Sequence, residues 1–361
     1  MFKILDRNRA PMGVIEWSQD CTITRKLDMD DRLLEFSITK EEYALSGIEL
    51  EGYIQTQNGE EFVIREIKRS YDGPVTVIAP YNVEELEGHI CHDLKTDQIS
   101  PDAAFVLARE RSGLDNWGSS SFGGISTKNR VINMENASMY EIIKQMNSTY
   151  RCECTIDSSQ KVVRFYAERG SDRGVYFHDE LNLKSIEIDS NSNEFYTEIE
   201  PYGKDDIDIA IANQGSKYLS NYTYSNKHKR CIWKDGRYTD PAILMIDAQD
   251  KLLDLCKPHT SYTVSIIDLA KMSDSYSFLD FGVGDTVTII SRRTKLKDKR
   301  RIIEIVEHPF DPTQNTCLIG DPKPNYQELI ESIRYSTGAV TSPYDLTSGH
   351  NPELLSSSSD D

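Results

Sequence analysis

The sequence predicts a β-rich α+β multidomain protein with two small β-barrel domains and α+β accessory domains. Three observations predict this class. Alternating or β-branched apolar runs, which have the period of strands, dominate both ends of the chain. Helical periodicity is confined to a few short segments between those ends. The length of 361 residues exceeds what one small core requires, which indicates two to four domains.

Residues 1–90 are predicted to form the first β-barrel domain. Apolar residues alternate over 34–38, so that they share one face of a strand. Thr39 and Glu42 have the spacing of a capping box, which predicts a short helix after this strand. Gly47 supplies the residue type that most often ends a helix. The helix therefore serves as a connection between strands.

Residues 91–176 are predicted to form an inserted α+β domain. Ser100 and Pro101 begin one helix, and a loop rich in Gly, Ser and Asn follows over 112–126. Ser138 and Glu141 form a second capping box. The further features are an apolar helical face of Met139, Ile142, Ile143, Met146 and Tyr150, and strands over 152–156 and 162–166.

Strand character returns after the inserted domain. Apolar residues alternate around 183–188 and again at Ile207, Ile209 and Ile211. We expect the segment at about 177–205 to complete the sheet of the first domain. No repeat of fixed period is visible, but two β-rich regions far apart in the chain are compatible with a duplicated barrel.

Residues 206–259 are predicted to form a second α+β accessory domain. Asp240 and Pro241 begin its helix, expected over 240–256, and Lys257-Pro258 ends it. The apolar stripe of this helix comprises Leu244, Ala248, Leu252, Leu255 and Cys256. We expect this stripe to pack on a barrel.

Residues 260–321 are predicted to form the second β-barrel domain. The strand period resumes over 262–266, and residues 281–285 form a tight turn with two glycines that are able to take positive φ. Further strands are expected over 286–290, 302–306 and 316–319. Residues 322–361 are predicted to contain one amphipathic helix and a flexible tail rich in Ser, Thr, Gly, Pro and Asp.

The composition excludes several classes of function. A formal net charge of −18 disfavours a sequence-reading nucleic-acid binder, although an acidic channel lets DNA pass without adhering. No stretch approaches the roughly 20 apolar residues of a membrane span, and the N-terminus lacks a signal-peptide core, so we expect synthesis in the cytoplasm. The seven cysteines are scattered and odd in number, which predicts free thiols.

The sequence provides no pattern that predicts a catalytic, cofactor-binding or metal-binding residue. His89, Cys91 and His92 are the densest group of potential metal ligands, but in a strand His92 points away from the other two. Cys152 and Cys154 share a strand face and are interpreted as core residues. No local signature of a serine, cysteine or zinc hydrolase occurs. We therefore expect no catalytic site, no metal and no cofactor.

Three sets of charged or aromatic residues could have either a structural or a functional role. The carboxylates of Asp28, Asp30 and Asp31, and of Asp205, Asp206 and Asp208, are interpreted as turn and solvent-face residues. The basic run over 292–301 is interpreted as a solvated hairpin tip, with contact to an acidic neighbouring subunit as the alternative. Tyr218, Tyr222, Tyr224 and Trp233 are interpreted as core or interface residues, with a carbohydrate platform as the alternative.

Short motifs along the chain resemble those of one family. They are Met12–Ile15, Asp31–Ser37 and Phe62–Ile64 near the N-terminus, Thr197–Lys204, Asn213–Gly215 and Tyr218 in the middle, and Gly282–Val287, Arg301–Ile305 and Leu318–Gly320 near the C-terminus. In order and spacing they resemble the phage tail hub proteins of the prophage endopeptidase tail type, also called tail-associated lysins. These are in turn similar to the baseplate hub proteins of contractile tails.

The resemblance implies a structural part of a virion, assembled in the cytoplasm of the bacterial host. It implies a homotrimeric hub at the tail tip, in which two barrels per chain make a pseudo-sixfold ring. The implied partners are the distal tail protein ring, the tape measure protein and a fibre or receptor-binding protein. DNA passes through without sequence-specific binding during ejection. The alternatives are a peptidoglycan endopeptidase, which the family label suggests, and a receptor-binding adhesin.

Overall fold

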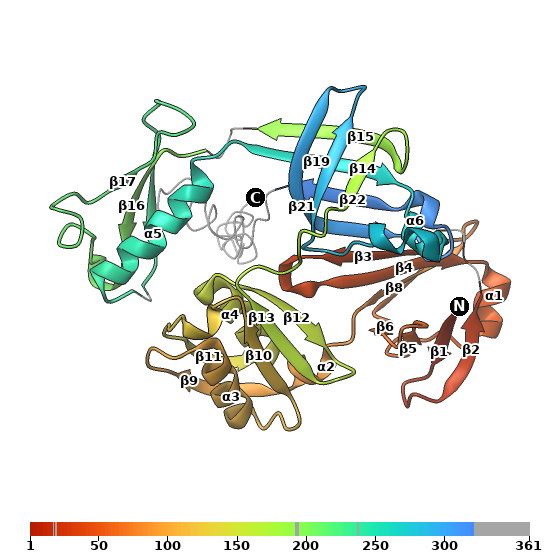
Figure 1. The fold of residues 1–361 in the computed structure, drawn as a ribbon. Coiled ribbons are helices and arrows are strands. Elements are labelled where there is room, and N and C mark those ends of the chain that lie inside the picture. The colour runs from red at the N-terminus through yellow and green to blue at the C-terminus, as the bar shows by residue number, and fades with distance from the viewer. Residues whose placement is uncertain (17, 19, 192–194, 237, 321–361) are drawn as a thin grey trace, which may run out of the picture. The chain divides into compact units, whose positions relative to one another are not determined.

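The computed structural model describes residues 1–16, 18, 20–191, 195–236 and 238–320 (Figure 1). These residues divide into two compact units, of which unit 1 comprises the described residues of 1–190 and 259–320 and unit 2 those of 191–258. The helix and tail predicted within 322–361 lie outside the described residues. Within the described part, no helix is both long and apolar enough to cross a membrane.

The main sheet of unit 1 has ten strands. Eight of them follow one another in the order β15-β19-β22-β21-β3-β4-β8-β7, while β20 pairs with β21 and β14 pairs with β20. Their bounds are β3 Thr22–Lys26, β4 Arg32–Ile38, β7 Glu66–Arg69, β8 Val75–Pro80, β14 Tyr176–His178, β15 Leu183–Asn191, β19 His259–Ile266, β20 Thr286–Ser291, β21 Leu296–Glu307 and β22 Thr316–Gly320.

Strand β21 joins the N-terminal and C-terminal β regions. Its first half pairs with β20, and its second half pairs with β3, where Glu304 lies opposite Lys26 and Glu307 opposite Ile23. Figure 1 shows the C-terminal strands β21 and β22 beside β3 and β4. The β-rich class is confirmed. The two closed barrels are not, because no sheet of the described residues closes on itself and both regions belong to one open sheet.

The segment expected to complete the N-terminal sheet pairs elsewhere. Strand β14 runs parallel to β20, and β15 lies beside β19, so both extend the C-terminal half of the main sheet. The apolar pattern of residues 183–188 correctly predicts a strand. It does not identify the partner, because pairing depends on register and edge geometry rather than on strand periodicity.

A four-stranded sheet in the order β2-β1-β5-β6 and the inserted α+β part complete unit 1. In the inserted part, β10 and β12 flank β13, and β9 pairs with β11. The bounds are β1 Phe2–Leu5, β2 Pro11–Ile15, α1 Lys40–Ser46, β5 Tyr53–Gln55, β6 Glu61–Val63, α2 Glu84–Gly88, β9 Ile90–Lys95, α3 Pro101–Ser112, β10 Gly118–Phe122, β11 Asn133–Ser138, α4 Met139–Tyr150, β12 Glu153–Asp157, β13 Val162–Tyr166 and α6 Leu269–Met272.

Both predicted capping boxes are confirmed. Thr39 caps α1 with Glu42, and Ser138 caps α4 with Glu141, in each case with reciprocal side-chain and backbone hydrogen bonds. The predicted apolar face of α4 is fully buried. The loop predicted over 112–126 is wrong in part, because Gly118–Phe122 forms β10 parallel to β13. Its serines lack the apolar alternation by which strands are recognised.

Unit 2 is a small sheet covered by one helix. Its elements are β16 Glu198–Tyr202, β17 Leu219–Ser220, β18 Arg230–Lys234 and α5 Pro241–Leu255. The predicted stripe of α5 packs on this sheet in one apolar core, not on a barrel. The alternation at Ile207, Ile209 and Ile211 is not a strand. Residues 204–206 form a 3₁₀ turn before it, and the side chain of Ile211 is 92 % exposed.

Candidate functional site: an ionic junction in unit 1

A chain of alternating, buried and partly buried charges connects three parts of unit 1. It runs Glu307, Arg25, Glu60, Arg32, Asp30 and Arg169, and continues through the backbone of Arg169 to Glu153 and Arg301. These residues come from the N-terminal strands, from the β12 end of the inserted part with the segment after β13, and from β21. Together these eight residues form the ionic junction.

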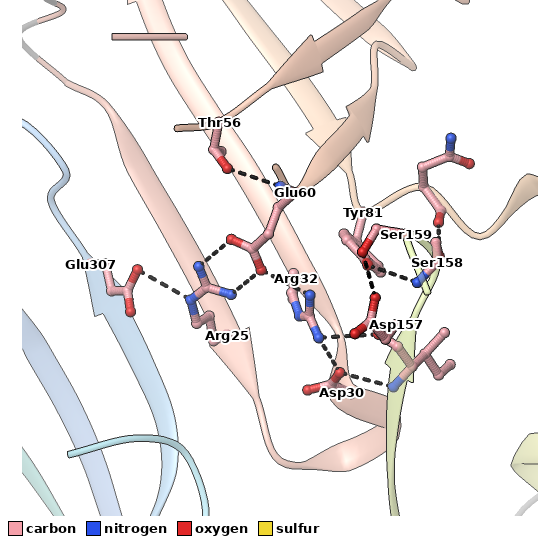
Figure 2. Close-up of polar contacts among 12 residues, drawn as sticks. Arg25, Asp30, Arg32, Thr56, Glu60, Tyr81, Asp157, Ser158, Ser159 and Glu307 are labelled. Carbon is pink, nitrogen blue, oxygen red and sulfur yellow. Dashed lines mark hydrogen bonds and ion pairs between the residues drawn. The ribbon is translucent and has the colours of Figure 1, made fainter. Parts of the chain in front are cut away.

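Arg25 on β3 bridges the N-terminal and C-terminal β regions. Its guanidinium donates two hydrogen bonds to Glu60, at 2.7 and 2.6 Å, and its Nε lies 3.1 Å from Glu307 on β21. Figure 2 shows Arg25 between these two carboxylates. Burial opposes the charge of Arg25, but Glu60 and Glu307 outweigh it and raise its pKa. Burial likewise opposes ionisation of Glu60, yet Arg25 and Arg32 lower its pKa.

Arg32 on β4 connects the N-terminal sheet to the inserted part. It donates to Glu60 at 2.8 Å, pairs with Asp30, and donates to the carbonyl of Ile156 at 3.2 Å (Figure 2). Asp30 in turn accepts a hydrogen bond from the Ile156 N–H at 3.1 Å. The guanidinium of Arg32 lies 4.2 Å from the ring centroid of Tyr81, which adds a cation–π contact. The edge of β12 is therefore bound at Ile156 to Arg32 of β4 and to Asp30 in the turn before it.

Arg301 and Glu153 form the most buried pair of the junction. Both guanidinium NH₂ groups of Arg301 donate to Glu153 at 2.8 Å, and the two side chains are 9 % and 6 % exposed. Arg301 also donates to the carbonyls of Gly284 at 3.0 Å and Arg169 at 2.6 Å. The Arg169 N–H donates to Glu153 at 2.6 Å, and its side chain donates to Asp30 at 2.6 Å. Arg169 thus connects the two halves of the junction.

Two glycines allow the backbone contact beside Arg301. Gly170 has φ +87°, and a Cβ built on it would lie 2.2 Å from the carbonyl carbon of Gly284. Gly284 has φ +94°, and its Cβ would lie 2.8 Å from the Arg169 carbonyl oxygen. Only glycine fits such an approach in that conformation. The predicted turn at 281–285 is confirmed with one left-handed glycine, Gly284.

The ionic junction is suited to positioning rather than to catalysis. Each carboxylate in it is already bound by one or two guanidinium groups, so none is free to act as a general acid or base. Desolvating this many charges has a large cost, and their mutual attraction recovers it only in this one geometry. The junction therefore fixes how the N-terminal strands, the inserted part and β21 meet within unit 1.

Two interpretations of charged residues were wrong at this site. Asp30 is not a solvent-face residue, since it is 5 % exposed and paired with Arg32 and Arg169. Arg301 is not part of a solvated hairpin tip, since it is paired with Glu153. Nothing local in the sequence marks the Asp30–Arg169 and Glu153–Arg301 pairs, because their partners are more than 100 residues apart. Arg292 and Arg293 lie at the exposed turn between β20 and β21 as predicted, where Arg292 contacts Glu180 at 2.6 Å. Lys297, Lys299 and Arg300 instead lie within β21 and pair with β20.

The candidate metal ligands do not converge. His89 lies 2.7 Å from the Glu85 carbonyl oxygen, His92 lies 2.9 Å from Asn136, and Cys91 is buried on β9. Over the residues that the structure describes, no three His, Cys, Asp or Glu side chains are arranged to hold a metal ion. Cys152 and Cys154 are buried around Asn147, as expected of core thiols.

The aromatic candidates divide between core and surface in unit 2. Trp233 is 2 % exposed in the core under α5, whereas Tyr218 is 38 % exposed and stacks on Arg230 with a cation-to-centroid distance of 3.7 Å. Glu198 accepts from Tyr222, lies 2.7 Å from His228 Nδ1 and accepts from Arg230 at 2.7 Å. Hydrogen bonds from Tyr222 and His228, followed by Arg230, lower the pKa of Glu198 to about 2.

Comparison with known proteins finds a family match over part of the chain. Residues 171–330 match the model of the prophage endopeptidase tail family, a range that includes the middle and C-terminal motifs of the sequence analysis. No curated protein sequence matches the chain.

Several solved structures have the same fold at low sequence identity. The prophage tail protein gp18 of Listeria monocytogenes EGD-e matches with a TM-score of 0.65 and 13 % identity, covering 93 % of this chain and 99 % of that one. The 43 kDa tail protein of prophage MuSo2 from Shewanella oneidensis matches with a TM-score of 0.63 and 10 % identity, covering 92 % and 99 %. The tail protein of Neisseria meningitidis MC58 matches with a TM-score of 0.60 and 9 % identity, covering 89 % and 96 %.

The family match and the fold agree with each other and with the motifs. The match falls on residues from both units, and the fold likeness extends over nine-tenths of the chain. Residues 171–330 therefore match the prophage endopeptidase tail family model, and the chain has the fold of prophage tail proteins, which confirms the predicted resemblance to phage tail hub proteins.

Proposed function

We propose that the chain is a structural component of a bacteriophage or prophage tail tip or baseplate. In this role it forms a homotrimeric hub that closes the distal tail tube, docks the distal tail protein ring, and opens for the tape measure protein and DNA. The observation that supports this proposal most strongly is the continuous sheet of unit 1, in which β21 joins the two ends of the chain. A tube end needs such an uninterrupted wall.

The ionic junction supports the same role. A hub must keep its shape while other proteins attach and while DNA passes, so its β regions need a fixed mutual geometry. Arg25 and Arg301 connect different regions through ion pairs with Glu307 and Glu153, and Arg32 connects them through its hydrogen bond to the Ile156 carbonyl. In some proteins a buried ionic network fixes one unique arrangement of the chain, and in this proposal the ionic junction has that role. The net charge of −18 is consistent with a lumen from which DNA is repelled.

The proposal also assigns a role to each region of the chain. Residues 1–90 and 260–321 serve as the two hub domains of the ring, and residues 91–176 and 206–259 serve as accessory domains. A fibre or receptor-binding protein attaches to the assembled hub. The protein is assembled in the host cytoplasm and remains in the virion.

A structural role without enzymatic activity fits the chemistry of the thiols and aromatic residues. Burial raises the pKa of all seven cysteine thiols, to about 12 for Cys21, Cys152 and Cys231, so they are poor nucleophiles. Trp233 lies in the core of unit 2 and is absent from any exposed carbohydrate platform. Neither an endopeptidase nor an adhesin is favoured by these observations.

Labelling of intact virions tests this proposal. Antibodies raised against the chain and coupled to gold are expected to bind at the tail tip in electron micrographs of induced phage particles. Absence of label from virions would contradict the hub role. Clearing of purified peptidoglycan by the isolated chain, abolished by a single His or Cys substitution, would instead establish the endopeptidase alternative.

A further inference from the structure

The hairpin between β5 and β6 carries Asn58-Gly59, the only Asn-Gly pair in the sequence. Its loop is a β-turn followed by a left-handed glycine, because the Gly59 N–H donates to the Thr56 carbonyl at 3.1 Å and Gly59 has φ +82°. Both residues of the pair are exposed. Among the residues that the structure describes, none forms a hydrogen bond with the Asn58 side chain. The amide of Asn58 therefore faces solvent at the tip of an ordered hairpin.

An Asn-Gly pair is prone to spontaneous deamidation because the reaction is intramolecular and the second residue is small. The backbone nitrogen of the following residue attacks the side-chain carbonyl carbon of asparagine, and the covalent chain holds the two atoms within reach. Any other residue would place a Cβ beside the attacking nitrogen, whereas glycine has none. A Cβ built on Gly59 would meet nothing within 4 Å, so no neighbouring group blocks this side of the loop either.

Water is the only co-reactant that the modification needs. The Gly59 nitrogen bonds to Cγ of Asn58 and gives up its proton, and the Cγ–Nδ2 bond breaks as Nδ2 takes a proton and leaves as ammonia. The product is a succinimide ring, which water then opens at one of its two carbonyl carbons. Breaking the bond to Cγ leaves aspartate. Breaking the bond to the backbone carbonyl carbon of residue 58 leaves isoaspartate, in which Cβ and Cγ become part of the main chain.

The surroundings of Asn58 favour the negative charge that develops in this reaction. Asn58 lines a cleft of about 560 Å³ within unit 1, and the other lining residues include three cationic side chains, Arg25, Arg169 and Lys271, against two carboxylates. The side chain of Lys271 is 58 % exposed, and its ion-pair partner Asp280 is 3.9 Å away. Positive charges near the reacting atoms stabilise the oxyanion that forms at Cγ. They also stabilise the carboxylate of either product.

The same hairpin positions Glu60 in the ionic junction. Thr56 forms two hydrogen bonds with this residue, since its N–H donates to the Glu60 carbonyl at 2.9 Å and its Oγ1 accepts from the Glu60 N–H at 3.2 Å. Figure 2 shows the second of these bonds, with the Glu60 carboxylate bound to Arg25 and Arg32. Isoaspartate at position 58 would lengthen the main chain between Thr56 and Glu60 by one carbon. The loop would then no longer fit the two bonds that fix Glu60.

We propose that Asn58 is the preferred site of spontaneous deamidation in this chain, and that isoaspartate formed there weakens the ionic junction by displacing Glu60. The protein therefore changes with age. The contacts of Arg25 and Arg32 with Glu60 are intact in new chains and loosen as the modified fraction grows. This modification is independent of the proposed hub role, because it requires only one hairpin and water.

Peptide mapping of aged protein tests the site. The full chain is kept in warm, mildly alkaline buffer made with H₂¹⁸O and is then digested with trypsin in ordinary water. The tryptic peptide 41–65 has Asn58 as its only asparagine, and opening of the succinimide introduces ¹⁸O. Mass spectrometry is expected to show two ¹⁸O-labelled forms that separate by chromatography, one with aspartate and one with isoaspartate. Asn226, an exposed asparagine before Lys227, is the internal control and should stay intact.

Urea unfolding before and after ageing tests the coupling to the ionic junction. The wild type is expected to lose stability as the fraction of isoaspartate rises. Asn58→Gln should keep its stability over the same period, because the longer glutamine side chain cyclises far more slowly. Freshly purified Asn58→Asp has the new charge without the longer main chain, and should unfold close to the wild type. Asn226→Gln is the matched control and should age like the wild type.

The two measurements separate the site from its effect. Deamidation at Asn226, or at another asparagine, that equals or exceeds deamidation at Asn58 would overturn the site. Conversion of Asn58 to isoaspartate without a loss of stability would overturn its coupling to Glu60. Selective conversion of Asn58, with a loss of stability that Asn58→Gln prevents, supports both parts of the proposal.

Discussion

At the scale of single residues, the stability of unit 1 depends on whether each buried charge keeps its partner. Arg301 is held by Glu153, by two backbone carbonyls and, at 3.3 Å, by Glu168. The two carboxylates differ sharply in environment, since the side chain of Glu153 is 6 % exposed and that of Glu168 is 70 % exposed. The same arginine therefore offers a buried and an exposed ion pair for comparison.

Replacing Glu153 by Gln is expected to lower the free energy of unfolding by about 3–5 kcal/mol, because it leaves Arg301 buried without its counter-charge. Glu168→Gln is the matched control and should cost less than about 1 kcal/mol, as exposed pairs do. Urea denaturation of the full chain measures both. If both substitutions lower the free energy of unfolding by the same small amount, the buried Glu153–Arg301 pair does not stabilise the contact between the three regions.

Gly170→Ala is expected to be more damaging than Gly174→Ala. Both glycines have positive φ, at +87° and +76°, so both substitutions carry the cost of that conformation, about 1–2 kcal/mol. At Gly174 the new Cβ meets nothing within 4 Å, whereas at Gly170 it collides with the Gly284 backbone. The collision should add about 1–3 kcal/mol to the loss. Thermal unfolding measures the loss of stability in both variants. Equal losses would contradict the predicted collision between a Cβ at Gly170 and the Gly284 backbone.

At the scale of elements, the sequence was most informative where a local rule decides the structure. The capping residues Thr39 and Ser138 begin their helices through bonds to the next turn, so spacing alone predicts them. Strand β10 was missed because its serines carry no apolar signal, and its pairing with β13 is a tertiary effect. Alternation from Ile207 to Ile211 predicted a strand, but the structure has none there. Asp205 and Asp206, just before this segment, have a left-handed backbone conformation that is not that of an extended strand.

The sheet of unit 2 should lose stability in acid. The pKa of Glu198 on β16 falls from 4.5 to about 2 in the folded chain, so its contribution is complete above pH 4.5. That contribution is lost as the pH falls from 4.5 through about 2, because the unfolded chain then binds the proton more readily. Urea unfolding between pH 6 and pH 2.5 should show this loss.

Glu198→Gln removes the titrating group and should reduce the decline in stability over this pH range. Glu110→Gln, at an exposed position of α3, is the control and should retain the decline of the wild type. If the pH dependence of Glu198→Gln matches that of the wild type, the bonds from Tyr222, His228 and Arg230 do not couple Glu198 to folding.

At the scale of the whole molecule, the β-rich class and the tail-protein resemblance were predictable, while the joints between regions were not. Arg25 and Glu307 lie at opposite ends of the chain, and no local pattern indicates that β3 and β21 pair. The ionic junction was missed for the same reason, since Asp30 and Arg301 look like surface charges in sequence.

The mass of the purified protein in solution tests the central claim most directly. Light scattering on a sizing column, over a range of concentrations, is expected to give three times the chain mass of 41.2 kDa. A trimer agrees with the proposed homotrimeric hub and leads to imaging of its channel. A mass of one chain at every concentration would contradict the homotrimeric hub.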